Sequence, residues 1–120
     1  MAHIIHLKTY WDDRWNLTVI EKSIPFDIKR VYYIYDVQAG LSRWWHRHKK
    51  TIQAAVCLQG TCTFFVDNWL KKEEFVLDKP DMCLIIHPED WHTMSFSDKA
   101  IVMVLASEYF NPDDYIQEWY

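Results

Sequence analysis

Short segments rich in β-branched and aromatic residues recur along this 120-residue chain at intervals of roughly ten residues. Turn-forming residues such as Gln59-Gly60 and Lys79-Pro80-Asp81 separate them. This spacing is typical of an antiparallel sandwich or barrel and not of alternating strands and helices. The expected strands cover residues 17–21, 30–37, 52–58, 62–67, 74–77, 82–87 and 100–106. We therefore predict one all-β domain over residues 1–120, built from short antiparallel strands.

One segment has the start signals of a helix. Asn111 can cap the first turn, and Pro112 suits the first helical position because a helix start needs no N–H there. Asp113 and Asp114 would face the positive end of the helix dipole. We expect a short C-terminal helix over residues 112–119.

Charge and hydropathy exclude several classes of protein. The net charge is -4, and no stripe of lysine or arginine is present to neutralise phosphates, so we expect no nucleic-acid partner. No apolar run approaches the ~20 residues of a membrane helix, and no secretory signal is visible, which favours a cytoplasmic location. Cys57, Cys62 and Cys83 are odd in number and have apolar neighbours, so we expect buried reduced thiols.

The densest polar cluster, residues 43–50, contains His46 and His48. Residues two apart in a strand share a face, so these histidines would project side by side. They could bind a metal ion, or transfer protons near neutral pH. A metal site would need further ligands: His92 is available, but Gln53 stands at the spacing where such a barrel places a glutamate. An uncharged glutamine weakens the metal alternative without removing it.

The segment from Arg30 to Val37 alternates as a strand does. One of its faces is expected to pack in the core, while the other offers a guanidinium group and a phenol to a ligand. Arg14, taken alone, has no functional signal, and His92 follows a turn at the start of a strand.

Six segments together resemble the TDP-4-keto-6-deoxyglucose 3,4-ketoisomerases, WxcM-like proteins of the cupin superfamily. The resemblance implies a cupin jelly-roll barrel, a homodimer that can exchange N-terminal strands, and no metal or cofactor. It also implies a TDP-linked keto-deoxysugar as substrate, in the synthesis of bacterial deoxyamino sugars. The segments are NLTVIE at 16–21, IPFDIKRVYYIYDV at 24–37, HRHKK at 46–50, LQGTC at 58–62, PEDWH at 88–92 and VLASEYFNPDDYI at 104–116.

The resemblance also implies roles for individual residues. The catalytic pair falls on His46 and His48. An arginine at Arg14 with a histidine at His92 resembles the branch of the family that forms the galacto-configured product. The expected substrate-binding residues are Arg14, Arg30, Tyr33, Arg43, Gln53 and His92.

Moving a ketone from C4 to C3 requires removal of the C3 proton and protonation of C4 through an enediol, which imidazoles can catalyse. We favour His48 as the carbon base. Two alternatives stay open: a non-catalytic cupin that binds a nucleotide sugar, and a metal-dependent cupin enzyme.

The chain has only two glycines but seven tryptophans. Members of the family carry glycine where this sequence has Trp15, Trp44 and Trp69. Our hypothesis is that the gene comes from an organism that reads the codon UGA as glycine. The intact mass of the protein from its native host checks this: we expect a mass lower than that of the printed sequence, and a mass with all seven tryptophans would exclude recoding.

Overall fold

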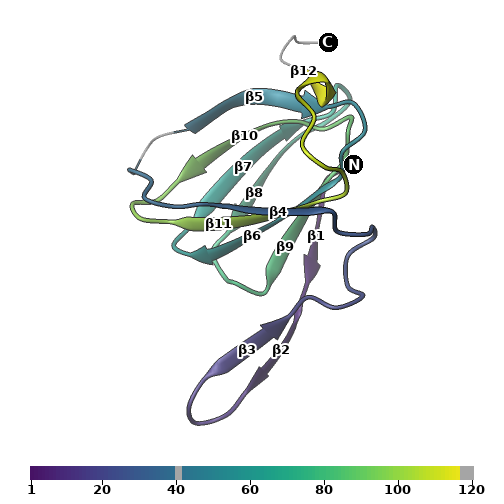
Figure 1. The fold of residues 1–120 in the computed structure, drawn as a ribbon. Helices are drawn as coiled ribbons and strands as arrows, with labels where there is room; N and C mark the ends of the chain where they lie inside the picture. Colours follow the sequence, from purple (N-terminus) through teal and green to yellow (C-terminus); the bar gives the residue numbers. More distant parts are fainter. Residues whose placement is uncertain (40–41, 117–120) are drawn as a thin grey trace.

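The computed structural model describes residues 1–39 and 42–116, with the backbone alone for residues 42–46. Most strands form two five-stranded antiparallel sheets (Figure 1). The first sheet has the order β1 (His3–His6), β9 (Met82–Ile86), β6 (Gln53–Gln59), β11 (Ile101–Ala106) and β4 (Arg30–Ile34). The second has the order β12 (Tyr115–Ile116), β5 (Ser42–His48), β10 (Trp91–Phe96), β7 (Cys62–Asp67) and β8 (Lys72–Leu77).

The core lies between the two sheets, where alternate residues of each strand face inward. In β7, Cys62, Phe64 and Val66 are buried in this core, whereas Phe65 is exposed. The all-β antiparallel architecture confirms the fold that the sequence predicts.

A second apolar cluster covers the outer face of the first sheet. Ala54, Val56, Cys83 and Ile85 belong to it, so β6 and β9 are buried on both faces. The prediction of buried free thiols is confirmed for Cys57, Cys62 and Cys83. Burial raises the pKa of Cys62 to about 12 and that of Cys83 to about 11, so both thiols are protonated at neutral pH.

The predicted C-terminal helix over residues 112–119 is wrong. Asn111 does cap a turn through its side chain, and Pro112 does begin it, but the turn is a 3-10 helix, η1 (Pro112–Asp114), of three residues. It ends because the next residues pair with β5 as strand β12, with Tyr115 opposite His48 and Ile116 opposite Arg47. Residues 117–120 lie outside the described part of the chain.

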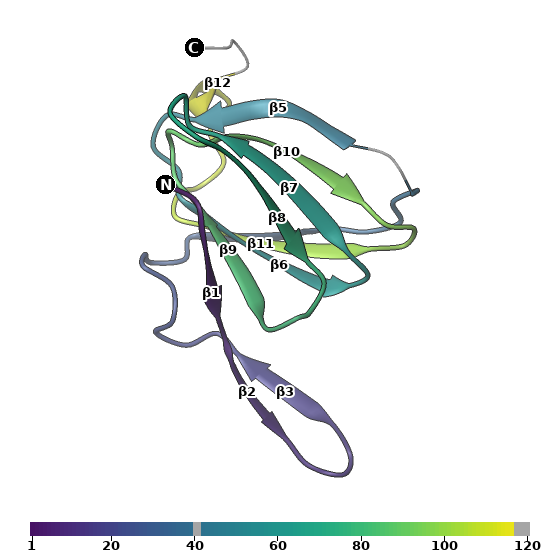
Figure 2. The same ribbon diagram turned by 180° about the vertical axis from the view of Figure 1, so that it is seen from behind.

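A separate hairpin projects away from both sheets (Figures 1 and 2). It consists of β2 (Lys8–Trp11) and β3 (Asn16–Val19), which pair only with each other. The hairpin exposes large apolar side chains, those of Tyr10, Trp11, Trp15 and Leu17. Within the described residues, no helix has the length and apolar character needed to cross a membrane.

Trp69 stands in the turn between β7 and β8 with a φ of 79°. A side chain at such a backbone angle is strained, because its Cβ approaches the following carbonyl oxygen. The Asp67 carboxylate accepts a hydrogen bond from the Trp69 N–H at 2.8 Å and holds the turn. Glycine would fit this angle without strain.

Replacing Trp69 with glycine should therefore raise the free energy of unfolding by about 1 kcal/mol. Urea denaturation followed by circular dichroism measures it. Trp15→Gly is the matched control. Trp15 is not one of the described non-glycine residues with positive φ, which are Lys22, Asp36, Trp69 and Lys99, so glycine relieves no such strain there. An unchanged or lower free energy for Trp69→Gly would contradict the proposed strain.

Candidate active site

A cavity of about 140 Å³ lies between the two sheets. Among the described side chains, five polar ones line it, and they come from strands β4, β6, β10 and β12. The other described lining residues are apolar. The polar group, Arg30, Tyr32, Gln53, His92 and Tyr115, interrupts an otherwise apolar interior, which is the usual composition of a small-molecule site.

The arginine and the amide are held by neighbouring aromatic groups. The Arg30 guanidinium lies 5.1 Å from the ring centroid of Tyr32 and 5.5 Å from that of Phe110. The Gln53 amide donates a hydrogen bond to the Tyr32 hydroxyl at 2.9 Å. These contacts fix a positive charge on β4 and an amide on β6, strands that β11 separates in the same sheet, and both groups can bind oxygen atoms of a ligand.

His92 is 1% exposed, and its ring orientation follows from one contact. A carbonyl oxygen can only accept, so His92 Nδ1 donates to the Asp90 carbonyl oxygen at 3.1 Å. This hydrogen bond assigns the proton of the neutral ring to Nδ1.

His48 is not one of the residues that line the cavity, but it contacts one of them, Tyr115. The two ring centroids are 4.5 Å apart, and the His48 side chain is 3% exposed. Its Nδ1 is 2.7 Å from Oδ2 of Asp114, a residue of the turn η1. Burial lowers the pKa of His48, and the hydrogen bond and negative charge of Asp114 offset this only in part. His48 is therefore neutral at pH 7 and able to accept a proton.

In Asp114, hydrogen bonds affect the pKa more than burial does. Burial alone would raise the pKa of its carboxyl group, but hydrogen bonds from Thr51, the Lys50 N–H and His48 outweigh burial and hold the pKa below its usual range. A neutral imidazole thus lies beside an ionised carboxylate in a dry environment.

Two predicted site residues fall where only the backbone is described. His46 is the register partner of His92 in the pairing of β5 with β10, and Arg43 is the partner of Met94. The side chains of both lie outside the described part of the chain. The backbone thus brings His46 and His92 opposite each other on adjacent strands.

Two other predicted residues lie away from the cavity of their own chain. Tyr33 is 64% exposed, because β4 alternates and its Arg30 and Tyr32 face inward. Arg14 stands in the turn of the β2–β3 hairpin, where it pairs with Asp12 at 2.9 Å and stacks on the Trp15 ring. Arg30, Gln53 and His92 are the predicted residues that the cavity brings together.

Three residues at or near the cavity, Tyr32, Tyr115 and Asp114, were not predicted from the sequence. Tyr32 could have been found, since residues two apart in a strand share a face and Arg30 was already a candidate. Tyr115 and Asp114 carried no such signal, because they were predicted to lie on a helix. Their contacts with His48 span more than sixty positions of sequence.

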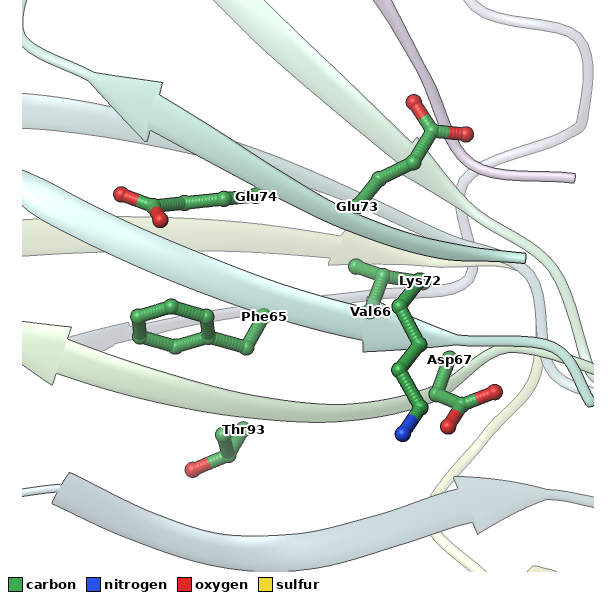
Figure 3. A pocket seen from close by; sticks show the side chains of 7 residues that line it. All are labelled: Phe65, Val66, Asp67, Lys72, Glu73, Glu74 and Thr93. Atoms are coloured by element: carbon green, nitrogen blue, oxygen red, sulfur yellow. The ribbon is translucent and has the colours of Figure 1, made fainter.

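A larger hollow of about 420 Å³ lies on the other face of the second sheet (Figure 3). Its residues, such as Phe65 and Thr93, alternate along β7 and β10 with the cavity residues Phe64 and His92. Lys72 and Glu74, two of the charged residues around it, are on the exposed surface. We assign the site to the smaller cavity because the buried His92 lines it and the buried His48 contacts Tyr115 of its wall.

Among the described side chains, which do not include that of His46, no group of three or more histidine, cysteine or acidic residues could hold a metal ion.

Comparison with known proteins places this arrangement in a family. The family model described as FdtA, WxcM-like, C-terminal, matches residues 1–120. A TDP-4-oxo-6-deoxy-alpha-D-glucose-3,4-oxoisomerase from Aneurinibacillus thermoaerophilus is 43% identical over 119 residues, covering 97% of this chain and 86% of that protein. The chain belongs to the WxcM-like FdtA family.

Solved structures agree in fold over nearly the whole chain. The 3,4-ketoisomerase QdtA from Thermoanaerobacterium thermosaccharolyticum, in complex with TDP, is 37% identical with a TM-score of 0.94, covering 98% of this chain and 88% of its own. The TDP-quinovose 3,4-ketoisomerase WlaRB from Campylobacter jejuni is 34% identical with a TM-score of 0.93, covering 98% and 92%. The RmlC epimerase of Mycobacterium tuberculosis, 18% identical with a TM-score of 0.82 over 97% of this chain and 68% of its own, shares the cupin-like fold.

Proposed function

We propose that this protein converts TDP-4-keto-6-deoxyglucose to its 3-keto isomer with the galacto configuration at C4. The chain is a TDP-sugar 3,4-ketoisomerase by family, and its relatives act on this substrate. The observation that carries the proposal is the neutral, buried His48, which lies beside an ionised Asp114 and contacts Tyr115 of the cavity wall.

The reaction moves two hydrogens and leaves the composition of the sugar unchanged. A base removes the C3 proton, which the C4 carbonyl acidifies, and the electron pair forms the C3=C4 bond of an enediol as O4 gains a proton. C4 then takes up a proton while O3 loses one, which gives a ketone at C3 and a hydroxyl at C4. His48 is the carbon base and acid, and His46 moves the protons between the oxygens.

Polar groups of the cavity stabilise the charge that develops on O3 and O4. Arg30 can donate to the enediolate, and Gln53 and His92 can orient the hydroxyl groups of the sugar. Arg43 is assigned to substrate binding near the diphosphate. Both arginines suit oxyanions because the guanidinium group is planar and always charged.

The galacto configuration is supported by a substituted form of QdtA. A double variant of that enzyme, in which a tyrosine becomes arginine and an arginine becomes histidine, is 39% identical to this chain, against 37% for QdtA itself. Two additional matches among 120 residues account for a difference of this size. This supports Arg14 and His92 as the corresponding pair, which the family resemblance connects with the galacto product.

We further propose a homodimer in which Arg14 serves the cavity of the partner subunit. Among the described strands, none joins the two-stranded β2–β3 hairpin as a third strand, and such hairpins are marginally stable alone. Its exposed Trp11 and Trp15 would be covered by a second copy.

The size of the cavity agrees with a site completed by a second chain. Its volume of about 140 Å³ is below the ~300 Å³ at which most ligand pockets begin. It can enclose the sugar, while the nucleotide must lie at its mouth. A hairpin from the partner subunit would add walls there.

Incubation with TDP-4-keto-6-deoxyglucose should give the 3-keto product, detected by proton NMR. A small coupling between H4 and H5 identifies the galacto isomer, and a large one would contradict the assigned configuration. His48→Asn should lower kcat by at least about 100-fold, because the carbon base is lost. It should retain TDP binding, as a histidine-to-asparagine variant of QdtA forms a complex with TDP-4-keto-6-deoxyglucose.

His3→Asn is the matched control, since His3 is exposed on β1 and should leave turnover unchanged. Undiminished turnover in His48→Asn would exclude His48 as the base. A wild-type protein that binds TDP but forms no product would be a non-catalytic cupin. Metal bound in stoichiometric amount, with loss of activity on chelation, would favour the metal-dependent alternative.

The composite site can be tested by mixing two inactive variants, Arg14→Ala and His48→Asn, under conditions where subunits exchange. If Arg14 acts across the dimer, each mixed dimer contains one intact site out of two. With equal amounts of the two variants, half of the dimers are mixed, so roughly a quarter of the wild-type activity returns. If Arg14 acted on its own subunit, every mixed site would carry a defect and no activity would return. A monomer in analytical ultracentrifugation would also contradict the proposal.

A further inference from the structure

The carboxylate of Asp114 is hydrogen-bonded to three residues of the segment 48–51. Its Oδ2 contacts Nδ1 of His48 at 2.7 Å and accepts from the Thr51 hydroxyl, and its Oδ1 accepts from the Lys50 N–H at 2.9 Å. The Asp114 carbonyl oxygen accepts from the Lys49 N–H at 2.8 Å. The Asp114 side chain is 4% exposed. The carboxylate is therefore rigidly placed against the histidine ring.

This arrangement decides which nitrogen of His48 carries the proton. An ionised carboxylate only accepts hydrogen bonds, so Nδ1 must be the donor. In the neutral ring the lone pair is then on Nε2, the nitrogen turned away from Asp114. His48 therefore has one defined atom, Nε2, that can accept a proton from a carbon atom of the substrate.

We propose that Asp114 is a positioning residue of the isomerase: it holds His48 in the Nδ1–H tautomer, so that Nε2 takes the C3 proton, and it stabilises the imidazolium that results. This role rests on the proposed function. During the step, the C3–H bond breaks, the Nε2–H bond forms, and the negative charge passes to the enediolate. The ring becomes positive beside the Asp114 carboxylate, and the later transfer to C4 reverses this change.

The surrounding charges agree with this role. The positive charge of Arg30 on β4 lowers the pKa of the His48 ring, as burial does. Tyr115 of β12 covers one side of the ring with an aromatic surface. Asp114 of η1 supplies the opposing negative charge. Without Asp114, burial and Arg30 would both disfavour the imidazolium, and proton removal from C3 would become harder.

A purely structural role for Asp114 would have a different signature. The residue also fastens η1 to the segment between β5 and β6 through Lys50 and Thr51, so its loss will reduce stability in any case. A structural anchor would not determine the tautomer of His48 or the pH dependence of turnover. These two quantities distinguish the roles.

The decisive variant is Asp114→Asn, which keeps the shape of the side chain but removes its charge. We expect kcat to fall at least about 100-fold, with KM changed less than about threefold, because the asparagine amide no longer enforces the Nδ1–H tautomer. The acidic limb of the kcat/KM profile should move to lower pH, since Asp114 is a group that raises the pKa of His48. Asp113→Asn is the matched control: Asp113 is exposed and adjacent, and its variant should retain the wild-type profile.

A second measurement does not depend on the variant folding. Nitrogen-15 NMR of the wild-type protein near neutral pH should show the His48 proton on Nδ1. The Nε2–H tautomer, or an Asp114→Asn variant with unchanged kcat and pH profile, would overturn the role of Asp114. An inactive wild-type protein would instead overturn the proposed function, so the two failures are distinguishable.

Discussion

The alternation of side chains along paired strands is the constraint on which this structure depends. In two facing sheets, one set of alternate residues fills the space between them and the other set faces outward. At one place, the inward set is polar, with Arg30 and Tyr32 on β4, Gln53 on β6 and His92 on β10. The same alternation that buries Phe64 thus also gathers the groups of the cavity, and a shift by one residue in any of these strands would exchange them for outward-facing ones.

This constraint explains how much the sequence could predict. Strand periodicity was sufficient for the all-β fold, because short strands and turns alternate at regular intervals. The same periodicity conflicts with the prediction that Arg30 and Tyr33 both bind the substrate in one cavity, since residues three apart in a strand point to opposite sides. The segment after Asn111 misled the analysis because its start signals are those of a helix, whereas pairing with β5 decides its conformation. Local signals cannot report such long-range pairing.

The site combines residues with very different origins in the sequence. His48 comes from a strand whose polar composition made it conspicuous, whereas Asp114 comes from a turn with no motif of its own. The cost of burying a histidine and a carboxylate is offset by their mutual hydrogen bond and by those from Lys50 and Thr51. The site therefore exists only when the sheets have assembled. The family to which the chain belongs then indicates the class of substrate.

The order of the elements in the chain has a consequence for biosynthesis. Turn η1 and strand β12 follow every other strand in sequence, yet they carry the partner of His48. A nascent polypeptide emerging from the ribosome can therefore pair the first eleven strands before the histidine acquires its partner. A chain that ends ahead of residue 114 would lack the carboxylate that contacts His48 Nδ1, so nothing in it would hold the histidine proton on that nitrogen.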